Sequence, residues 1–531
     1  MSTRDESLFG QARRALGWSF ASTLFGRLSL LAIGIVLARV LGPQEFGTFA
    51  VAMVALLAVL SFNELGVSLA VVRWPGPSGE IVPTVATLSV VSSTLIYVGC
   101  YFGAPTFATA MGEPGAVPVI RVLALSVIVS GLVAAPVGIL QRAFRQDRKM
   151  IADQVTAWLG SFTSIGLALT GLGAMSLAIG QLVGSVVGAI LLIAFAPAGL
   201  RLGFNPAKAR ELLRFGLPLA GSSVVVFAST NVDRLVVGAA LGPVALGYYA
   251  LAVNLANWPV SVFSQPVRAV APAALARLQS DPPAMRQTFL STAGLLAAVT
   301  LPACALLAAA SPLGIRLLYG SEWAQAATVL RWLALLAALR IVFEFAYDYL
   351  VVLARSRFLL VLQVVWLVAL LAVLYPAARE GGLWAVSMAQ FAVALLVVLP
   401  LYLFELRRGG IPLQPLAMRF STALAASVVL AGVAVLADRA IGPDLVALPV
   451  VAVAGAAVLG LLLYRMRGVL GHLRGLNSDD ASPQSAGPVG PQRTTAGDQA
   501  SEISLVGEPV PSAGTVQTSL DAVPLWPRGN P

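Results

Sequence analysis

Histidine, cysteine and charged residues are scarce in this chain of 531 residues. It has one histidine, His472, and two cysteines, Cys100 and Cys304, which both lie inside apolar runs. We therefore expect no disulfide framework, no metal site and no catalytic site built on histidine. Charged residues make up 11% of the chain, against about 25% in an ordinary globular protein. The chain thus lacks the polar surface that a soluble domain needs.

Apolar residues dominate instead. Hydrophobic residues make up 58% of the chain, and the mean hydropathy is +0.87. Most of the chain is therefore expected to face lipid, which excludes a soluble enzyme, a nucleic-acid-binding module and a disordered scaffold. The formal net charge of +10 does not indicate nucleic-acid binding. In a membrane protein, positive residues mark the loops that stay in the cytoplasm.

Apolar stretches of about 20 residues, long enough to cross a bilayer as helices, recur along the chain. We predict 14 of them, and the first is too long for the core of a signal peptide. The predicted spans are 19–40, 46–66, 82–103, 116–140, 151–171, 174–196, 214–240, 244–265, 289–311, 325–350, 358–376, 382–404, 416–437 and 445–464.

The loops between these spans predict the orientation. With the N-terminus inside, the outside loops receive only Arg39, Arg316, Arg379 and Arg439. The inside loops receive many more Lys and Arg residues, Arg268 among them. The bias never reverses along the chain, so it favours 14 spans with both termini in the cytoplasm.

The sequence contains an internal repeat. Residues 41–52 read LGPQEFGTFAVA, and residues 241–252 read LGPVALGYYALA. A weaker similarity links the segments that begin at Gly171 and Gly382. Spans 1–6 therefore resemble spans 7–12, and because six is even, the two halves should have the same orientation.

The repeat predicts an all-α membrane protein with two parallel six-helix lobes and two additional helices. The expected divisions are a cytoplasmic segment, an N-lobe, a C-lobe, the two additional helices and a tail. Because the tail is rich in Pro, Ser and Gly, it is expected to be disordered and cytoplasmic. In order, the divisions cover residues 1–18, 19–213, 214–410, 411–465 and 466–531.

Charged residues inside the predicted spans are the main indicators of function. Insertion of a charge into the hydrocarbon costs roughly 2.5–3.5 kcal/mol, so such residues usually face a water-filled cavity or a partner. Arg27, Asp233, Arg234 and Glu344 are the deepest, and we expect them to face a cavity. The residues nearer to span ends can reach the interface instead; they are Glu64, Arg121, Arg331 and Asp348.

Arg340, Glu344 and Asp348 are spaced four apart, so they share one helix face. Two interpretations stay open. Arg340 and Glu344 could neutralise each other for insertion, or the three could form a polar stripe along a transport pathway. Asp233 has no arginine one turn away in its own helix, so it is the preferred ion-coupling residue before Glu344. The alternative for Asp233 is a structural hydrogen bond to a neighbouring helix.

Several short motifs resemble one known family. They are Leu37-Ala38-Arg39-x-Leu41-Gly42-Pro43-x-x-Phe46-Gly47, Asn231-x-Asp233-Arg234-x-x-x-Gly238, Leu241-Gly242-Pro243-x-x-x-Gly247-Tyr248-Tyr249 and Tyr319-Gly320-x-Glu322-Trp323. Together, over about residues 10–465, they resemble the Wzx-type polysaccharide-transporter flippases. Those flippases belong to the multidrug/oligosaccharidyl-lipid/polysaccharide (MOP) superfamily.

This resemblance implies a function and a site. Such proteins move undecaprenyl-diphosphate-linked oligosaccharides across the bacterial plasma membrane by alternating access, and they are transporters rather than enzymes. Cationic side chains in the cavity hold the diphosphate, which here implies Arg27, Arg234 and Arg340 as substrate-binding residues. The resemblance implies no cofactor; proton coupling, sodium coupling and no coupling stay open. Polysaccharide polymerases and glycosyltransferases are the expected partners, besides the lipid-linked substrate and membrane lipids.

Three other functions compete with this one. A lipid II flippase of peptidoglycan synthesis and a drug/cation antiporter belong to the same superfamily. An O-antigen polymerase or a lipid-linked glycosyltransferase would be an enzyme. Polymerases need a large outside loop and such transferases need acidic residues in the first outside loop, where this chain offers only Glu45. No motif in the sequence names the glycan.

Overall fold

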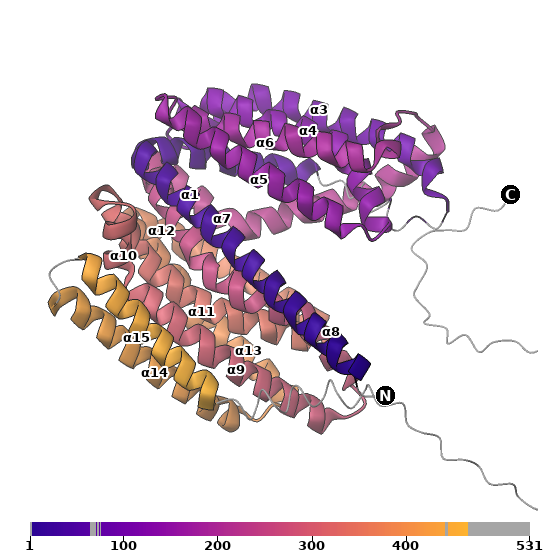
Figure 1. Cartoon of the computed structure of the whole chain (residues 1–531). Coiled ribbons are helices and arrows are strands. Elements are labelled where there is room, and N and C mark those ends of the chain that lie inside the picture. Colours follow the sequence, from indigo (N-terminus) through magenta and orange to yellow (C-terminus); the bar gives the residue numbers. More distant parts are fainter. Residues whose placement is uncertain (1–2, 64–70, 72–73, 75, 441–443, 466–531) are drawn as a thin grey trace, which may run out of the picture. The chain divides into compact units, whose positions relative to one another are not determined.

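The computed structural model describes residues 3–63, 71, 74, 76–440 and 444–465 (Figure 1). Within these residues the regular structure is helical throughout, which confirms the predicted all-α fold. The α-helices are α1 (Thr3–Asn63), α3 (Ser78–Ala110), α4 (Ala116–Arg142), α5 (Gln146–Leu169), α6 (Ala174–Phe195), α7 (Pro206–Pro259), α8 (Gln265–Arg277), α9 (Pro282–Ala309), α10 (Ser311–Leu318), α11 (Ala324–Val352), α12 (Ser356–Val393), α13 (Leu399–Arg408), α14 (Leu413–Ala440) and α15 (Asp444–Arg465).

The chain is a multi-pass membrane protein. Among the described residues, nine helical segments are long and apolar enough to cross a membrane. Three of them, 31–61, 226–264 and 356–408, each hold parts of two predicted spans, which meet at backbone breaks at Gly42, Gly242 and Gly382. The count of 14 spans and the division into lobes stay predictions.

Some predicted boundaries differ from the structure. Helix α1 begins at Thr3, so the predicted N-terminal segment is helical. Helix α7 begins at Pro206 rather than residue 214, because Asn205 caps it: the Asn205 side chain accepts hydrogen bonds from the backbone N–H groups of Ala207 and Lys208. Glu64, His472 and the predicted tail 466–531 lie outside the described residues.

The two copies of the repeat adopt the same local structure. Helix α1 breaks at Gly42 with φ 70° and ψ 174°, and α7 breaks at Gly242 with φ 83° and ψ −177°. This left-handed φ suits glycine, and the proline that follows each glycine is well placed to start the next helix. Each Gly-Pro pair therefore ends one span and begins another.

The two breaks also meet each other. A Cβ placed on Gly47 would lie 2.2 Å from the Pro243 carbonyl oxygen, and one placed on Gly247 would lie 2.8 Å from the Pro43 carbonyl oxygen. Each copy thus contacts the other through the same pair of positions, as at an interface with two-fold symmetry. The sequence repeat is therefore also a pseudosymmetric contact between α1 and α7.

Further sets of helices pack side by side. Helices α3, α4, α5 and α6 lie alongside one another, and α14 packs against both α9 and α15 (Figure 1). A large cluster of buried apolar residues links α1, α7, α9, α11, α12 and α13. The site described below lies among α7, α8, α11, α12 and α13.

Candidate functional site

A polar cavity of about 440 Å³ lies in the C-terminal half of the chain. It brings together three of the predicted residues, Asp233, Arg340 and Glu344, and adds Arg268. The other lining residues are mostly polar or aromatic: Ser229, Thr230, Val232, Leu336, Phe343, Tyr347, Gln363, Trp366, Leu367, Leu370, Gln390 and Tyr402. Charges of both signs thus face one cavity.

Three contacts between α11 and the α7–α8 segment form what we term the polar ladder. Arg340, Glu344 and Asp348 supply one side, one helical turn apart on α11. A π-helical turn over Val260–Ser264 joins α7 to α8 and changes the helix phase there. The partners of the α11 residues are Asn257 before this turn, Ser264 at its end and Arg268 after it.

The distances in the polar ladder define its pairing. Arg340 Nη1 lies 3.4 Å from Asn257 Oδ1, and the Ser264 hydroxyl donates to Glu344 Oε2 at 2.6 Å. Arg268 donates through Nε and Nη2 to both oxygens of Asp348, at 3.0 and 3.3 Å, and its Nη1 lies 3.7 Å from Glu344 Oε2. Among the described residues, Glu344 therefore pairs with Arg268 rather than with Arg340.

Arg268 corrects one predicted loop assignment. We had assigned it to an inside loop, but it lies in α8 and lines the cavity. Asp348, which we expected could reach an interface, is 7% exposed and ion-paired with Arg268. One sequence signal pointed to Arg268: it follows the apolar run ending at Ser264 by one helical turn, without an intervening charge.

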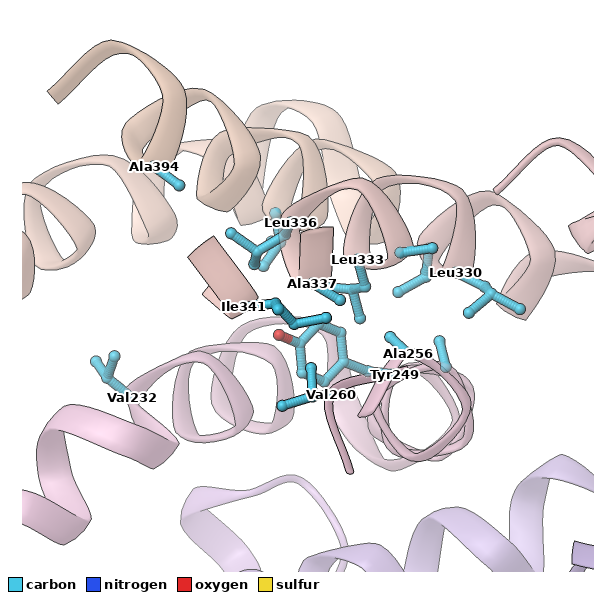
Figure 2. Packing of buried hydrophobic residues seen from close by; sticks show 14 of the residues in the cluster. Val232, Tyr249, Ala256, Val260, Leu330, Leu333, Leu336, Ala337, Ile341 and Ala394 are labelled. Atoms are coloured by element: carbon cyan, nitrogen blue, oxygen red, sulfur yellow. The ribbon is translucent and has the colours of Figure 1, made fainter. Parts of the chain in front are cut away.

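Asp233 takes part in a second hydrogen-bonded group, the Tyr249 triad. The buried Tyr249 hydroxyl donates to Asp233 Oδ2 at 2.5 Å and accepts from Gln390 Nε2 at 2.6 Å. The Tyr249 ring lies between α7 and the face of α11 that carries Leu333, Ala337 and Ile341 (Figure 2). The triad ties both sides of the α7 break to α12. Sequence reasoning quoted Tyr249 only as a motif residue and missed Gln390.

The other two predicted arginines are placed differently. Arg234 is half-buried, and its Nη1 donates to Asn231 Oδ1 at 3.1 Å, in the same helix. It is not among the residues that line the cavity, as expected for a neighbour rotated by about 100° from Asp233. Arg27 lies in α1, one turn before Leu31, but its side chain lies outside the described part of the structure.

The charges around the cavity are unevenly matched. Arg268 is engaged by two carboxylates. Among the described residues, Arg340 contacts a neutral amide and no carboxylate within ion-pair distance. An arginine without a counter-charge can bind an anionic oxygen of a ligand, and its planar fork suits a phosphate group. Asp233 and Glu344 face the same space and can accept a proton or a cation.

Three of the four family-like motifs converge at a different place, next to the α1–α7 junction. Trp323 is buried there: its indole N–H donates to the Ala38 carbonyl at 3.3 Å, and its ring makes edge contacts with Phe46 and Tyr248. The Tyr248 hydroxyl donates to the Glu322 carbonyl at 3.0 Å. Arg39, which we had assigned to an outside loop, lies in α1 and donates to the Leu317 and Leu318 carbonyls at the end of α10. These contacts link α1, α7 and the segment between α10 and α11.

Curated relatives of the chain are named for polysaccharide biosynthesis. It is 27% identical over 325 residues to the succinoglycan biosynthesis transport protein ExoT of Rhizobium meliloti, covering 61% of this chain and 65% of that one. It is 26% identical over 351 residues to the lipopolysaccharide biosynthesis protein WzxC of Escherichia coli, covering 64% and 68%. The chain thus spans just under two thirds of the first of these relatives.

Solved structures share the fold. The lipid II flippase MurJ, in an inward closed conformation, superposes with a TM-score of 0.71 at 15% identity, over 85% of this chain and 99% of that chain. An inward-facing multidrug MATE transporter of the MOP superfamily superposes with a TM-score of 0.58 at 18% identity, over 72% and 93%. Residues 36–328 match the family described as "Polysaccharide biosynthesis protein". The chain belongs to this family.

Proposed function

We propose that this protein is a flippase for lipid-linked oligosaccharides, which it moves across the bacterial plasma membrane for the synthesis of a surface polysaccharide. The observation that carries the proposal is the polar cavity with Arg340 inside a multi-pass helical fold. The names of the relatives support the substrate class, because one names succinoglycan biosynthesis transport and the other names lipopolysaccharide biosynthesis. An undecaprenyl-diphosphate carrier supplies the anion that an unmatched arginine binds.

Arg340 is the proposed principal ligand for the diphosphate. It lines the cavity and makes no ion pair with a described carboxylate, so its charge stays available to a substrate. Arg234 and Arg27 are proposed as further contacts, since an alternating-access cycle can present a moving lipid to different cations. To contact the diphosphate, the Arg234 guanidinium would have to break its hydrogen bond to Asn231.

Asp233 and Glu344 are the proposed coupling residues. A coupling site needs a carboxylate that changes charge or binds a cation, and both line the cavity. Asp233 is favoured, because Glu344 already has Arg268 within 3.7 Å. A proton or sodium ion bound at Asp233 would act on the Tyr249 triad and so on the contact between α7 and α12.

The remaining parts of the proposal concern setting and partners. We propose that both termini lie in the cytoplasm, that the chain catalyses no covalent chemistry, and that it requires no cofactor. Its partners in the cell would be the glycosyltransferases that build the substrate and the polymerase that consumes it outside.

Export in living cells tests the role of Arg340. Cells lacking the gene are complemented with variants, and surface polysaccharide and accumulated lipid-linked repeat units are measured. Arg340→Ala should lower export by about tenfold, since a hydrogen bond to a charged group contributes about 1.5–3 kcal/mol. Arg340→Lys should keep part of the activity because it retains the charge but loses the planar fork.

Arg407→Ala is the matched control, because Arg407 is exposed at the end of α13 and does not line the cavity. Its export should equal that of the wild type. Normal export by Arg340→Ala cells, at normal protein levels, would refute the assigned role.

A further inference from the structure

A second cavity, of about 210 Å³, lies between α1, α7 and the end of α10. We refer to it as the aromatic cavity. Three of its eight lining residues, Phe46, Trp258 and Tyr319, are aromatic. A fourth, Asn254, adds a side-chain amide. Its lining contains no charged residue among those described, in contrast to the polar cavity.

The polar groups of the aromatic cavity are open to a ligand, and Asn254 is exposed. Among the described residues, no hydrogen-bond partner is found for the Asn254 amide, the Trp258 indole N–H or the Tyr319 hydroxyl. Tyr319 lies outside the apolar spans, and burial raises its pKa to about 12, so the hydroxyl stays protonated and can donate. Three neutral hydrogen-bonding groups and three aromatic faces thus point to a neutral, polar ligand.

Two of the lining side chains of the aromatic cavity are held in place by packing. Phe46 and Tyr319 both pack against the buried Trp323 ring, with centroids 5.5 and 6.3 Å away. Phe46 and Trp258 belong to the two helices, α1 and α7, that meet at the glycine contact. A ligand here would touch both halves of the repeat at once. A wall fixed in this way is suited to recognition, because little side-chain entropy is lost on binding.

We infer that the aromatic cavity is a binding subsite for one uncharged sugar ring of the transported glycan. This inference deepens the proposed flippase function and rests on it. Sugar rings offer apolar C–H faces to aromatic side chains and hydroxyl groups to amides, indoles and phenols. A hydrocarbon tail would leave the three polar groups unpaired, and a diphosphate would find no cation among the described lining residues.

The position of Trp258 relates the subsite to the polar cavity. Trp258 lines the aromatic cavity, whereas its neighbour Asn257 contacts Arg340 of the polar ladder. Helix α7 therefore turns Trp258 toward the aromatic cavity and the adjacent Asn257 toward Arg340, as its rotation of about 100° per residue allows. The diphosphate and a sugar attached to it would be recognised at two faces of the same helix turn, about 100° apart.

Binding of defined lipids to the full-length protein in nanodiscs tests the subsite. The probes are undecaprenyl diphosphate alone and undecaprenyl diphosphate carrying glucose, galactose or N-acetylglucosamine. Wild-type protein should bind at least one glycosylated lipid about tenfold more tightly than the bare lipid. Trp258→Ala and Asn254→Ala should each remove most of this preference while leaving the affinity for the bare lipid unchanged.

Two comparisons separate failure of the subsite from failure of the proposed function. Arg340→Ala should weaken all probes by the same factor, and Trp384→Ala, an exposed tryptophan outside both cavities, should change nothing. If no sugar improves binding to the wild type, or if the preference survives both cavity variants, the subsite is refuted. If no probe binds at all, the flippase proposal fails with it.

Discussion

Tyr249 is the residue on which the proposed coupling depends most. Its hydroxyl holds the Asp233 carboxylate and the Gln390 amide together inside the apolar contact between α7 and α11 (Figure 2). A change in the charge of Asp233 must alter this bond, because the oxygen that accepts it would carry a proton or share a cation. The triad is therefore the proposed link between an ion gradient and helix movement.

Substitution of Asp233 tests this link. Asp233→Asn keeps the shape of the side chain but removes its titratable charge. If transport is driven by a proton or sodium gradient, the variant should lose the dependence on that gradient while binding of the lipid changes little. Reconstituted flipping with and without the gradient measures this. Tyr249→Phe should weaken the dependence as well, and an unaltered gradient dependence in Asp233→Asn would exclude Asp233 as the coupling residue.

The ion pair of Arg268 with Asp348 predicts an effect on stability. Arg268→Ala leaves Asp348, whose side chain is 9% exposed, without its partner. Because the Arg268 side chain is 40% exposed, the expected cost is about 2 kcal/mol, below the 3–5 kcal/mol typical of a fully buried pair. Thermal unfolding of the purified protein measures it, and adding Asp348→Asn to Arg268→Ala should recover part of the loss.

The exposed pair of Lys149 with Asp153 is the control for that measurement. Lys149→Ala should change the free energy of unfolding by no more than about 0.5 kcal/mol, because solvent screens such a pair. Equal effects of Arg268→Ala and Lys149→Ala would show that the polar ladder contributes nothing to stability.

At the scale of elements, the contact between α1 and α7 makes the closest approach of a glycine to backbone among the described residues. A Cβ on Gly47 would overlap the Pro243 carbonyl oxygen, and backbone cannot move aside as a flexible side chain can. Gly47→Ala should therefore destabilise the protein by about 1–3 kcal/mol, the usual cost of overpacking. Thermal unfolding and export should both fall.

Gly314→Ala is the matched control for the junction, because nothing lies within 4 Å of a Cβ at that position. A glycine inside a helix costs roughly 0.5–1 kcal/mol relative to alanine, so this variant should be as stable as the wild type or more so. If Gly47→Ala behaves like Gly314→Ala, the two breaks do not pack as the structure describes.

Sequence reasoning succeeded where one local signal decides the structure. Long apolar runs predicted the helical membrane fold, and the predicted gaps between spans at 41–45 and 241–243 coincide with breaks at Gly42 and Gly242. It failed where packing decides. Arg268 was assigned to a loop because a charge after an apolar run usually marks the interface, and only the π-helical turn and the carboxylates of α11 place it in the cavity.

At the scale of the whole molecule, the proposed function depends on two cavities of different chemistry. The polar cavity offers Arg340 and two carboxylates, and the aromatic cavity offers neutral donors and ring faces. A lipid-linked oligosaccharide combines an anionic diphosphate with neutral sugars, so it can use both. The fold of MurJ is shared, but a shared fold does not determine the substrate.

Flipping by the purified protein in proteoliposomes tests the central claim most directly. The liposomes contain an undecaprenyl-diphosphate-linked oligosaccharide repeat unit, and its arrival in the other leaflet is followed with an impermeant glycan-modifying enzyme. Wild-type protein should speed this movement far beyond that of protein-free liposomes, and Arg340→Ala should slow it by about tenfold. Lipid II in parallel liposomes should move more slowly. No acceleration by the wild type, or faster movement of lipid II, would contradict the proposed function.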